Sequence, residues 1–228
     1  MIKTIMFDFD GTLTYKTKNI WKAIWEELGY DIKDPKSGYL SQMKLFNDGL
    51  IDYQGWCDIT AQSFIKKNMS KDTLSNVTKD IKLMNGFDDF VDTLSKQNIK
   101  LNIVSGNFTE VIINVLKDKR KYFESINANN LIYDNNGYLT KIIGTNYDYE
   151  GKAKFIQEYA TSHNISPQEI CFIGNGNNDE WAYKSGCKTI CINPDDTNHN
   201  DKNKWHKSIT NIDNINDLLP LIFEDETK

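Results

Sequence analysis

Arginine is almost absent from this sequence. Of the 27 Lys and Arg residues in 228, only Arg120 is an arginine. The planar guanidinium that grips a carboxylate or a phosphate with two parallel hydrogen bonds is therefore available at one position. Asp and Glu number 32, which leaves a net charge of −5. This balance excludes the broad basic face with which nucleic-acid-binding proteins neutralise phosphates, so we expect no nucleic-acid partner.

Cysteine pairs and long apolar runs are also missing. Isolated cysteines such as these, with no Cys-x-x-Cys spacing, are expected to be buried free thiols: Cys57, Cys171, Cys187 and Cys191. No stretch approaches the ~20 apolar residues of a membrane span, and the first apolar run is too short for a secretory signal. The three histidines have no metal-ligand spacing. We expect a cytoplasmic protein with no membrane partner.

What the sequence contains is the composition of a folded globular chain, with 39% hydrophobic and 12% aromatic residues. The apolar run from Ile2 to Phe9 breaks at Asp10-Gly11-Thr12, which is typical of a buried parallel strand that ends in a loop. From Gly86 onward helical and strand patterns alternate, which indicates a parallel sheet covered on both faces. The fold class is therefore predicted to be α/β.

The stretch between these two parts has a different character. From Ile20 to about residue 84, apolar residues recur at helical spacing without a convincing strand. We therefore predict a core domain made of residues 1–14 and 86–228, and a small α-helical domain, residues 15–85, inserted after the first strand. Further along, two β-prone runs flank Asn135-Asn136-Gly137, which is a strong hairpin signal.

Two groups of polar residues follow expected strands. Asp8 and Asp10 are two residues apart, so both project from the same side of an extended chain, and such a pair favours a cation. The second group, Ser105-Gly106-Asn107, lies between an apolar strand and a helix. A hydroxyl, a permissive glycine and free amides at a helix start can form a phosphate pocket.

Two further groups complete the set. Lys152 opens a helix, where lysine is unfavourable against the helix dipole unless an anion lies nearby. The glycine-rich loop from Gly174 to Asp179 follows a buried strand. Each group alone also fits an ordinary turn, cap or surface residue. Because open α/β sheets bind ligands at the carboxyl ends of their strands, all four are expected on one rim.

In this order, the four groups resemble the motifs of the haloacid dehalogenase superfamily: Asp-x-Asp-x-Thr, a Ser or Thr, a Lys, and an acidic Gly-Asp loop. The resemblance covers nearly the whole chain and is closest to the phosphoserine phosphatase-like branch. It implies a Rossmann-like doubly wound parallel sheet with a helical cap. It also implies a Mg²⁺-dependent phosphatase that hydrolyses a small phosphorylated metabolite through an aspartyl-phosphate intermediate.

The same resemblance assigns roles to individual residues. Asp8 would be the nucleophile, Asp10 the acid and then the base, and Lys152 the cation that offsets the phosphoryl charge. The phosphoryl group would be bound by Thr12, Ser105, Gly106 and Asn107. Magnesium would be bound by Asp8, Asp10, Asn175 and, directly or through another ligand, Asp179.

The chain departs from the family pattern at Asn175, where the family has a metal-binding Asp. An amide oxygen can coordinate Mg²⁺ but brings no charge. Three interpretations stay open: a phosphatase with altered metal binding, a protein that binds phosphorylated ligands with little turnover, or a substitution introduced to trap a complex. A phosphomutase or phosphotransferase is a further alternative. A dehalogenase is disfavoured because halide displacement needs no acid such as Asp10.

A second departure concerns the substrate. The resemblance implies that phosphoserine is recognised by an arginine in the cap and a glutamate near the first motif. Residues 15–85 contain no arginine and residues 14–18 no acid, so phosphoserine is disfavoured. The cap is rich in aromatic residues instead. Most are expected to form its core, and one or two could line a pocket for a ring or a quaternary amine. The cap is expected to open and close over the site.

Overall fold

A central mixed sheet organises the protein. The computed structural model describes residues 1–15, 19–34, 36–194 and 204–224. Within these ranges seven strands form one sheet in the order β4-β3-β2-β1-β5-β6-β7, parallel except for β4. The strands are β1 (Thr4–Phe7), β2 (Lys100–Phe108), β3 (Phe123–Tyr133), β4 (Leu139–Ile143), β5 (Ile170–Gly174), β6 (Lys188–Ile192) and β7 (Lys207–Ile209).

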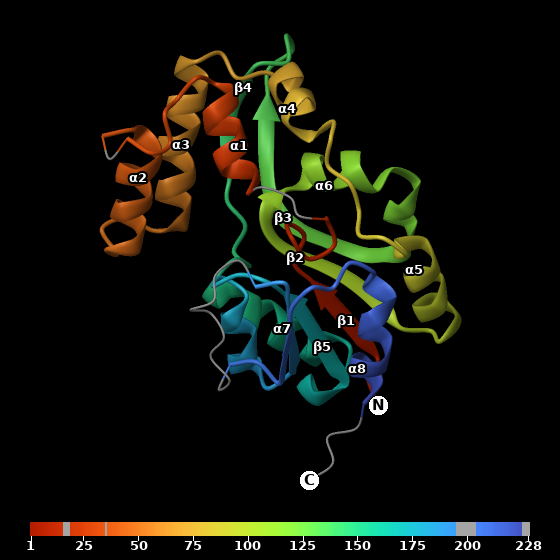
Figure 1. Cartoon of the computed structure of the whole chain (residues 1–228). Helices are drawn as coiled ribbons and strands as arrows, with labels where there is room; N and C mark the ends of the chain where they lie inside the picture. Colours follow the sequence, from red (N-terminus) through yellow and green to blue (C-terminus); the bar gives the residue numbers. More distant parts are fainter. Residues whose placement is uncertain (16–18, 35, 195–203, 225–228) are drawn as a thin grey trace.

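Helices cover both faces of this sheet (Figure 1). Successive residues of a strand point to opposite faces, and in β1 Ile5 and Phe7 pack in one apolar cluster while Met6 packs in another. The first cluster includes α5 (Phe87–Lys96) and α8 (Leu219–Phe223), and the second includes α7 (Glu150–Ser162). This arrangement confirms the predicted doubly wound α/β fold.

Four helices follow β1 in the chain and lie together beside β3 and β4 (Figure 1). We call them the cap helices: α1 (Ile20–Glu27), α2 (Gly38–Asn47), α3 (Tyr53–Lys66) and α4 (Lys71–Thr78). Their apolar residues form one cluster that also takes in Leu131, Leu139 and Ile142 of the β3–β4 hairpin. The cap helices therefore share a hydrophobic core with an extension of the sheet.

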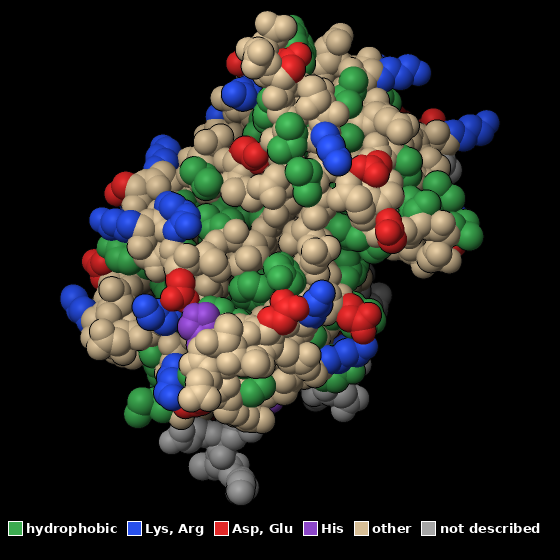
Figure 2. Space-filling view, turned by 180° about the vertical axis from the view of Figure 1, so that it is seen from behind, with side chains coloured by type: hydrophobic (Ala, Val, Ile, Leu, Met, Phe, Trp, Pro, Cys, Tyr) green, Lys and Arg blue, Asp and Glu red, His purple; other side chains and the backbone are tan. Residues whose placement is uncertain are grey.

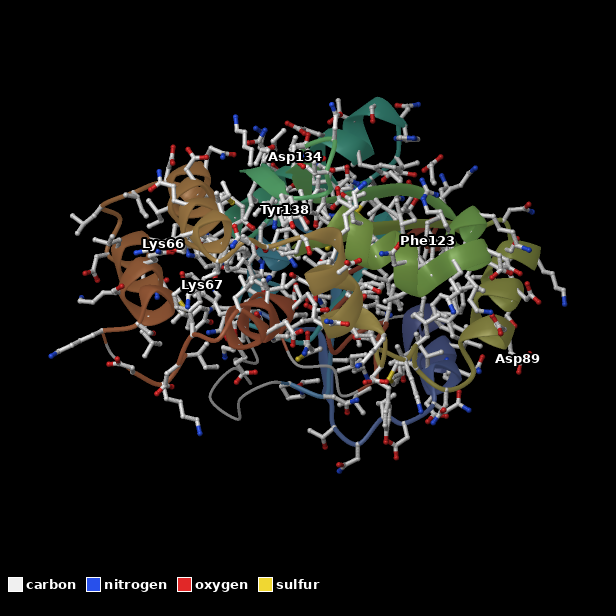
Figure 3. The ribbon with its side chains drawn as sticks, turned by 90° about the horizontal axis from the view of Figure 1, so that it is seen from above. Lys66, Lys67, Asp89, Phe123, Asp134 and Tyr138 are labelled. Atoms are coloured by element: carbon white, nitrogen blue, oxygen red, sulfur yellow. The ribbon has the colours of Figure 1, made fainter. Side chains whose placement is uncertain are left out.

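The hairpin turn between β3 and β4 contains the expected Asn135-Asn136-Gly137. Asp134 Oδ1 accepts hydrogen bonds from the backbone N–H groups of Asn136 and Tyr138, both at 2.9 Å. Figure 3 shows Asp134 and Tyr138 at this tip, with Lys66 and Lys67 at the end of α3 on one side of the view and Asp89 of α5 on the other. Leu139 N donates to Met69 O at 2.9 Å, which joins the hairpin to the chain between α3 and α4.

Several elements differ in detail from the sequence-based expectation. The apolar run from Ile99 predicts a strand that ends at Val104, whereas β2 continues to Phe108, because Phe108 pairs with Asn129 of β3 across an irregularity in register. The pattern from Ile215 to Phe223 predicts one helix interrupted at Pro220, and the structure divides it into η5 (Ile215–Leu218) and α8, with Pro220 in the first turn of α8, where the missing N–H costs no helical hydrogen bond. The polar stretch from Asp195 to Lys204 predicts a loop and lies mostly outside the described residues.

The prediction of buried free thiols is confirmed for all four cysteines. No helix in the described ranges is long and apolar enough to cross a bilayer. Seen from behind, the surface carries acidic and basic side chains interspersed among apolar and neutral ones (Figure 2). The remaining helical segments are α6 (Thr109–Leu116) and the short 3₁₀ turns η1 (Lys117–Tyr122), η2 (Pro167–Glu169) and η3 (Glu180–Ser185).

Candidate active site

The four polar groups meet at the carboxyl ends of β1, β2 and β5. A cavity of about 380 Å³ opens there, lined on the core side by seven of the residues the sequence singles out or their neighbours: Asp8, Asp10, Ser105, Gly106, Asn107, Asn175 and Asn178. A larger hollow of about 890 Å³ lies at the opposite edge of the sheet, around Ile2, Ile99 and Lys188. It contains none of the predicted site residues, so the smaller cavity is the candidate active site.

Lys152 contacts Asp8 from outside the cavity lining, with its side chain fully buried. Its Nζ donates to Asp8 Oδ1 at 3.1 Å and to Asp179 Oδ1, which explains the lysine at the start of α7. Burial disfavours the charged form, yet the carboxylates of Asp179, Asp8 and Asp148 outweigh it and raise the pKa of Lys152. The three carboxylates therefore favour the charged form of the ammonium.

Both carboxylate oxygens of Asp179 accept hydrogen bonds. Its Oδ2 accepts hydrogen bonds from the backbone N–H groups of Asn175 and Gly176, both at 2.9 Å, while Oδ1 pairs with Lys152. A side chain at Gly174 would not fit, because its Cβ would lie 2.6 Å from Asp179 Cβ. This carboxylate thus holds the glycine-rich loop and the lysine together rather than facing the cavity.

Asp8 has an unusually high proton affinity. Burial, followed by the charge of Asp179, raises its pKa to about 8, and Lys152 and a hydrogen bond from Ser105 offset only part of this. Burial and the neighbouring acid therefore both disfavour the charged carboxylate. A bound cation at this edge would favour it.

Asp10 is held between the core and the cap helices. Asn107 Nδ2 donates to Asp10 Oδ1 at 2.7 Å, and the backbone N–H of Ile20, the first residue of α1, donates to Oδ2 at 3.4 Å. Asn107 is predicted to bind the phosphoryl group, but here its amide is directed at Asp10. Ser105, buried beside it, accepts a hydrogen bond from the Asn107 N–H at 3.2 Å.

The loop that follows β1 is in direct contact with the glycine-rich loop that follows β5. Thr12 Oγ1 donates to Asn175 Oδ1 at 3.3 Å. Gly11 has φ of +72°, and a Cβ there would lie 2.4 Å from Asn175 Nδ2, so only glycine allows this approach. Thr12 therefore binds the glycine-rich loop and, unlike the phosphate-binding residue predicted from the sequence, does not line the cavity.

The oxygen donors present suit Mg²⁺, although they carry little charge. Within the described residues no group of three His, Cys, Asp or Glu side chains is arranged to hold a metal ion. The donors that the family resemblance assigns are instead the Asp8 carboxylate, the backbone carbonyl of Asp10 and the amide oxygen of Asn175, all hard donors of the kind Mg²⁺ prefers. These three residues line the same cavity, so the chemistry of the donor set fits the ion.

Two residues of the site escaped the sequence-based prediction. Asp148 is only 6% exposed, lines the cavity and lies 3.8 Å from Lys152 Nζ. Tyr149 follows it with φ of 48° and ψ of −124°, a conformation that costs a non-glycine residue about 1–3 kcal/mol. Asp148 could have been found from its position four residues before Lys152, whereas backbone strain leaves no mark in a sequence.

The cap side of the cavity is formed by α1, α2 and α3 through Asn19, Trp21, Lys22, Tyr39, Met43, Asn47 and Trp56. Trp56 stacks on Trp21 and on Phe46, with ring centroids 5.1 Å and 5.2 Å apart, and Trp21 also packs on Phe108 of the core at 4.6 Å. Trp21 Nε1 donates to Gly106 O at 2.8 Å. The tryptophan rings thus join cap to core, which leaves Tyr39 and Tyr149 as the other rings at the cavity.

Comparison with known proteins agrees with this geometry. The model of the haloacid dehalogenase-like hydrolase family matches residues 5–180. The chain is similar to phosphoserine phosphatase of Lactococcus lactis, with 30% identity over 105 residues, or 46% of this chain and 47% of that protein. It is also similar to phosphoserine phosphatase of Saccharomyces cerevisiae, with 24% identity over 179 residues, or 78% of this chain and 54% of that protein.

The matches span between a quarter and about half of the length of the curated relatives. Among solved structures, a phospho-aspartyl intermediate analogue of phosphoserine phosphatase has the same fold, with a TM-score of 0.71 at 21% identity over 97% of this chain and 99% of that one. The family match, the doubly wound sheet and the four polar groups at its rim lead to one conclusion: this chain belongs to the haloacid dehalogenase-like hydrolase family.

Proposed function

We propose that this protein is a phosphoric monoester hydrolase that releases phosphate from a small phosphorylated metabolite through an aspartyl-phosphate intermediate at Asp8. The observation that carries the proposal is the buried contact between Asp8 and Lys152 at the carboxyl end of β1. A carboxylate and a phosphate dianion repel each other, so an Asp nucleophile works only where fixed positive charge offsets both. Lys152 provides such charge.

In the first step, an Asp8 oxygen attacks phosphorus and the bond to the leaving alcohol oxygen breaks. Lys152 holds Oδ1 of this carboxylate in place. Asp10 donates its proton to the departing oxygen. Asn107 Nδ2 donates to Asp10 Oδ1 and the Ile20 N–H donates to Oδ2, and these two contacts orient the carboxyl group for the transfer.

In the second step, Asp10 accepts a proton from water, and this water attacks phosphorus and frees Asp8. The N–H of Gly106 and the hydroxyl of Ser105 support the phosphoryl oxygens in both steps. Asp8, the Asp10 carbonyl and Asn175 would hold Mg²⁺, which when bound offsets the negative charge of the phosphoryl group and the nucleophile. Residues 15–85 are proposed to act as a cap that excludes water from the cavity.

The substrate is proposed to be a phosphomonoester other than phosphoserine. The described lining of the cavity contains Lys22 but no arginine, and Arg120 lies in η1, where it donates to the backbone carbonyl of Phe123. The guanidinium that a substrate carboxylate would favour is therefore not supplied. The relatives named phosphoserine phosphatase support the reaction class rather than this substrate.

The test is phosphate release from a panel of phosphorylated metabolites with and without Mg²⁺. We expect turnover that requires Mg²⁺ and disappears in Asp8→Asn, and turnover that survives this substitution would exclude the covalent step. Asn175→Asp tests the alternative of a binding protein, since hydrolysis that appears only in this variant would favour binding without turnover. Incorporation of labelled oxygen from water into the released phosphate would show hydrolysis, whereas phosphoryl transfer to another hydroxyl group would leave no label.

A further inference from the structure

Asp148 is a buried acid for which the proposed catalytic steps have no use. Its side chain is 6% exposed and lies against Gly106, where an added Cβ would be 2.3 Å from Asp148 Oδ2. A carboxylate so close to Gly106, which is proposed to bind the phosphoryl group, repels a phosphate dianion. Its position must therefore be controlled if phosphate is to bind.

Three hydrogen-bond donors hold this carboxylate. Oδ1 accepts from the backbone N–H of Tyr149 and from Asn178 Nδ2, both at 2.9 Å, and Oδ2 accepts from the Tyr53 hydroxyl at 3.2 Å. Lys152 Nζ is 3.8 Å from Oδ1, at the outer limit of an ion pair and farther than the 3.1 Å that separates it from Asp8. The carboxylate is thus held next to the ammonium without a short contact to it.

Tyr53 is the one of these donors that comes from the cap helices, where it begins α3. Its hydroxyl accepts a hydrogen bond from Asn129 Nδ2 at 3.1 Å, and Asn129 Nδ2 also donates to Gly106 O at 2.7 Å. Burial and the charge of Asp148 raise the pKa of Tyr53 well above its ordinary value, so the hydroxyl keeps its proton. The cap therefore reaches Asp148 through one hydroxyl group.

We propose that Tyr53 is a positioning residue that holds the Asp148 carboxylate away from Lys152, so that the ammonium serves a phosphoryl group only while α3 is docked on the core. The inference rests on the proposed function, because that function assigns Lys152 to the phosphoryl group. When the hydroxyl is removed, Oδ2 loses its donor from the cap. The charge of Lys152 then draws Asp148 into a direct ion pair that competes with phosphate.

The experiment measures binding of inorganic phosphate by calorimetry in the presence of Mg²⁺. We expect Tyr53→Phe to raise the Kd for phosphate about fivefold to tenfold, the effect of one charge-assisted hydrogen bond. Asp148→Asn should bind phosphate at least as tightly as the unmodified protein, and adding Tyr53→Phe to it should change the Kd less than twofold. Tyr30→Phe is the matched control, since the Tyr30 hydroxyl donates to Ser63 O within the cap helices.

Three results would overturn the inference: an unchanged Kd in Tyr53→Phe, an equal loss of affinity when Tyr53→Phe is added to Asp148→Asn, or no phosphate binding by the unmodified protein. If Tyr53→Phe does not unfold cooperatively, Asp148→Asn decides alone, because weaker binding in that variant contradicts the repulsion proposed here. Failure of the proposed function has a separate signature. Phosphate would bind and the variants would behave as expected, but no phosphomonoester would be hydrolysed.

Discussion

The two walls of the cavity are built in different ways. At the core wall the charged groups are buried and bonded to one another: Asp8, which lines the cavity, pairs with Lys152, which in turn pairs with Asp179. On the cap wall the polar residues Asn19, Lys22 and Asn47 are exposed, whereas the aromatic residues Trp21, Tyr39 and Trp56 are buried. Buried charges are costly to disturb, while exposed polar groups are cheap to change. The difference indicates that the core wall carries the chemistry and that the exposed part of the cap wall is free to vary with the substrate.

The largest effect should come from removing the central cation of the core wall. Lys152→Met leaves three acids buried without their shared partner, so we expect the free energy of unfolding to fall by about 3–5 kcal/mol. Urea denaturation measures the change. Lys154→Met, two residues along the same helix and paired with Glu158 in an exposed i,i+4 contact at 3.8 Å, is the control and should change stability by less than about 0.5 kcal/mol. Similar losses in both variants would remove the contrast between buried and exposed charge.

A second effect of the core wall depends on pH. In metal-free protein the pKa of Asp8 is raised from 3.8 to about 8, so the folded state keeps a proton that the unfolded state has lost. Stability from this group is present below pH 4 and is lost as the pH rises toward 8, at up to about 1.4 kcal/mol per pH unit. Asp8→Asn should therefore stabilise the protein more at pH 8 than at pH 5.

Urea denaturation of both proteins in a chelator at the two pH values measures this difference. Parallel stability profiles for the two proteins would show that Asp8 does not titrate between these pH values.

A smaller effect is expected where the cap meets the core. Trp21→Phe removes the hydrogen bond to Gly106 O, which keeps Asn129 as a second donor, so we expect about 1 kcal/mol of lost stability and a KM increase larger than the change in kcat. Trp25→Phe, one turn later in α1, replaces the indole that packs on Tyr30, Tyr39 and Phe64 with a smaller ring. This control should lower stability without changing KM. Equal KM changes in both would mean that the cap acts only through its own packing.

The smallest effect belongs to the exposed part of the cap wall. Lys22→Met should change the free energy of unfolding by less than about 0.5 kcal/mol, because the Lys22 side chain is exposed on α1. Its consequence should appear in substrate preference, as a few-fold change in relative kcat/KM across the panel of phosphomonoesters. An equal decrease for every substrate would instead place Lys22 in the chemistry shared by all of them.

The sequence predicted what depends on local pattern. Apolar runs identified the strands, and the rule that parallel strands end at one edge brought Asp8, Ser105 and Lys152 together. It could not predict contacts that only the folded chain creates. The close approach of Asp148 to Gly106 and the hydrogen bond from Asn107 to Asp10 are contacts of this kind.

The apolar cluster shared by the cap helices and the β3–β4 hairpin limits how this family member can be recombined. A cap completes its own interior in a modular insertion, and such a segment can be exchanged between proteins. Here Leu131, Leu139 and Ile142 lie far along the chain from the cap helices, yet they fill the same interior. A change of cap would therefore have to bring its hairpin with it, because two separate stretches of the chain fill one interior.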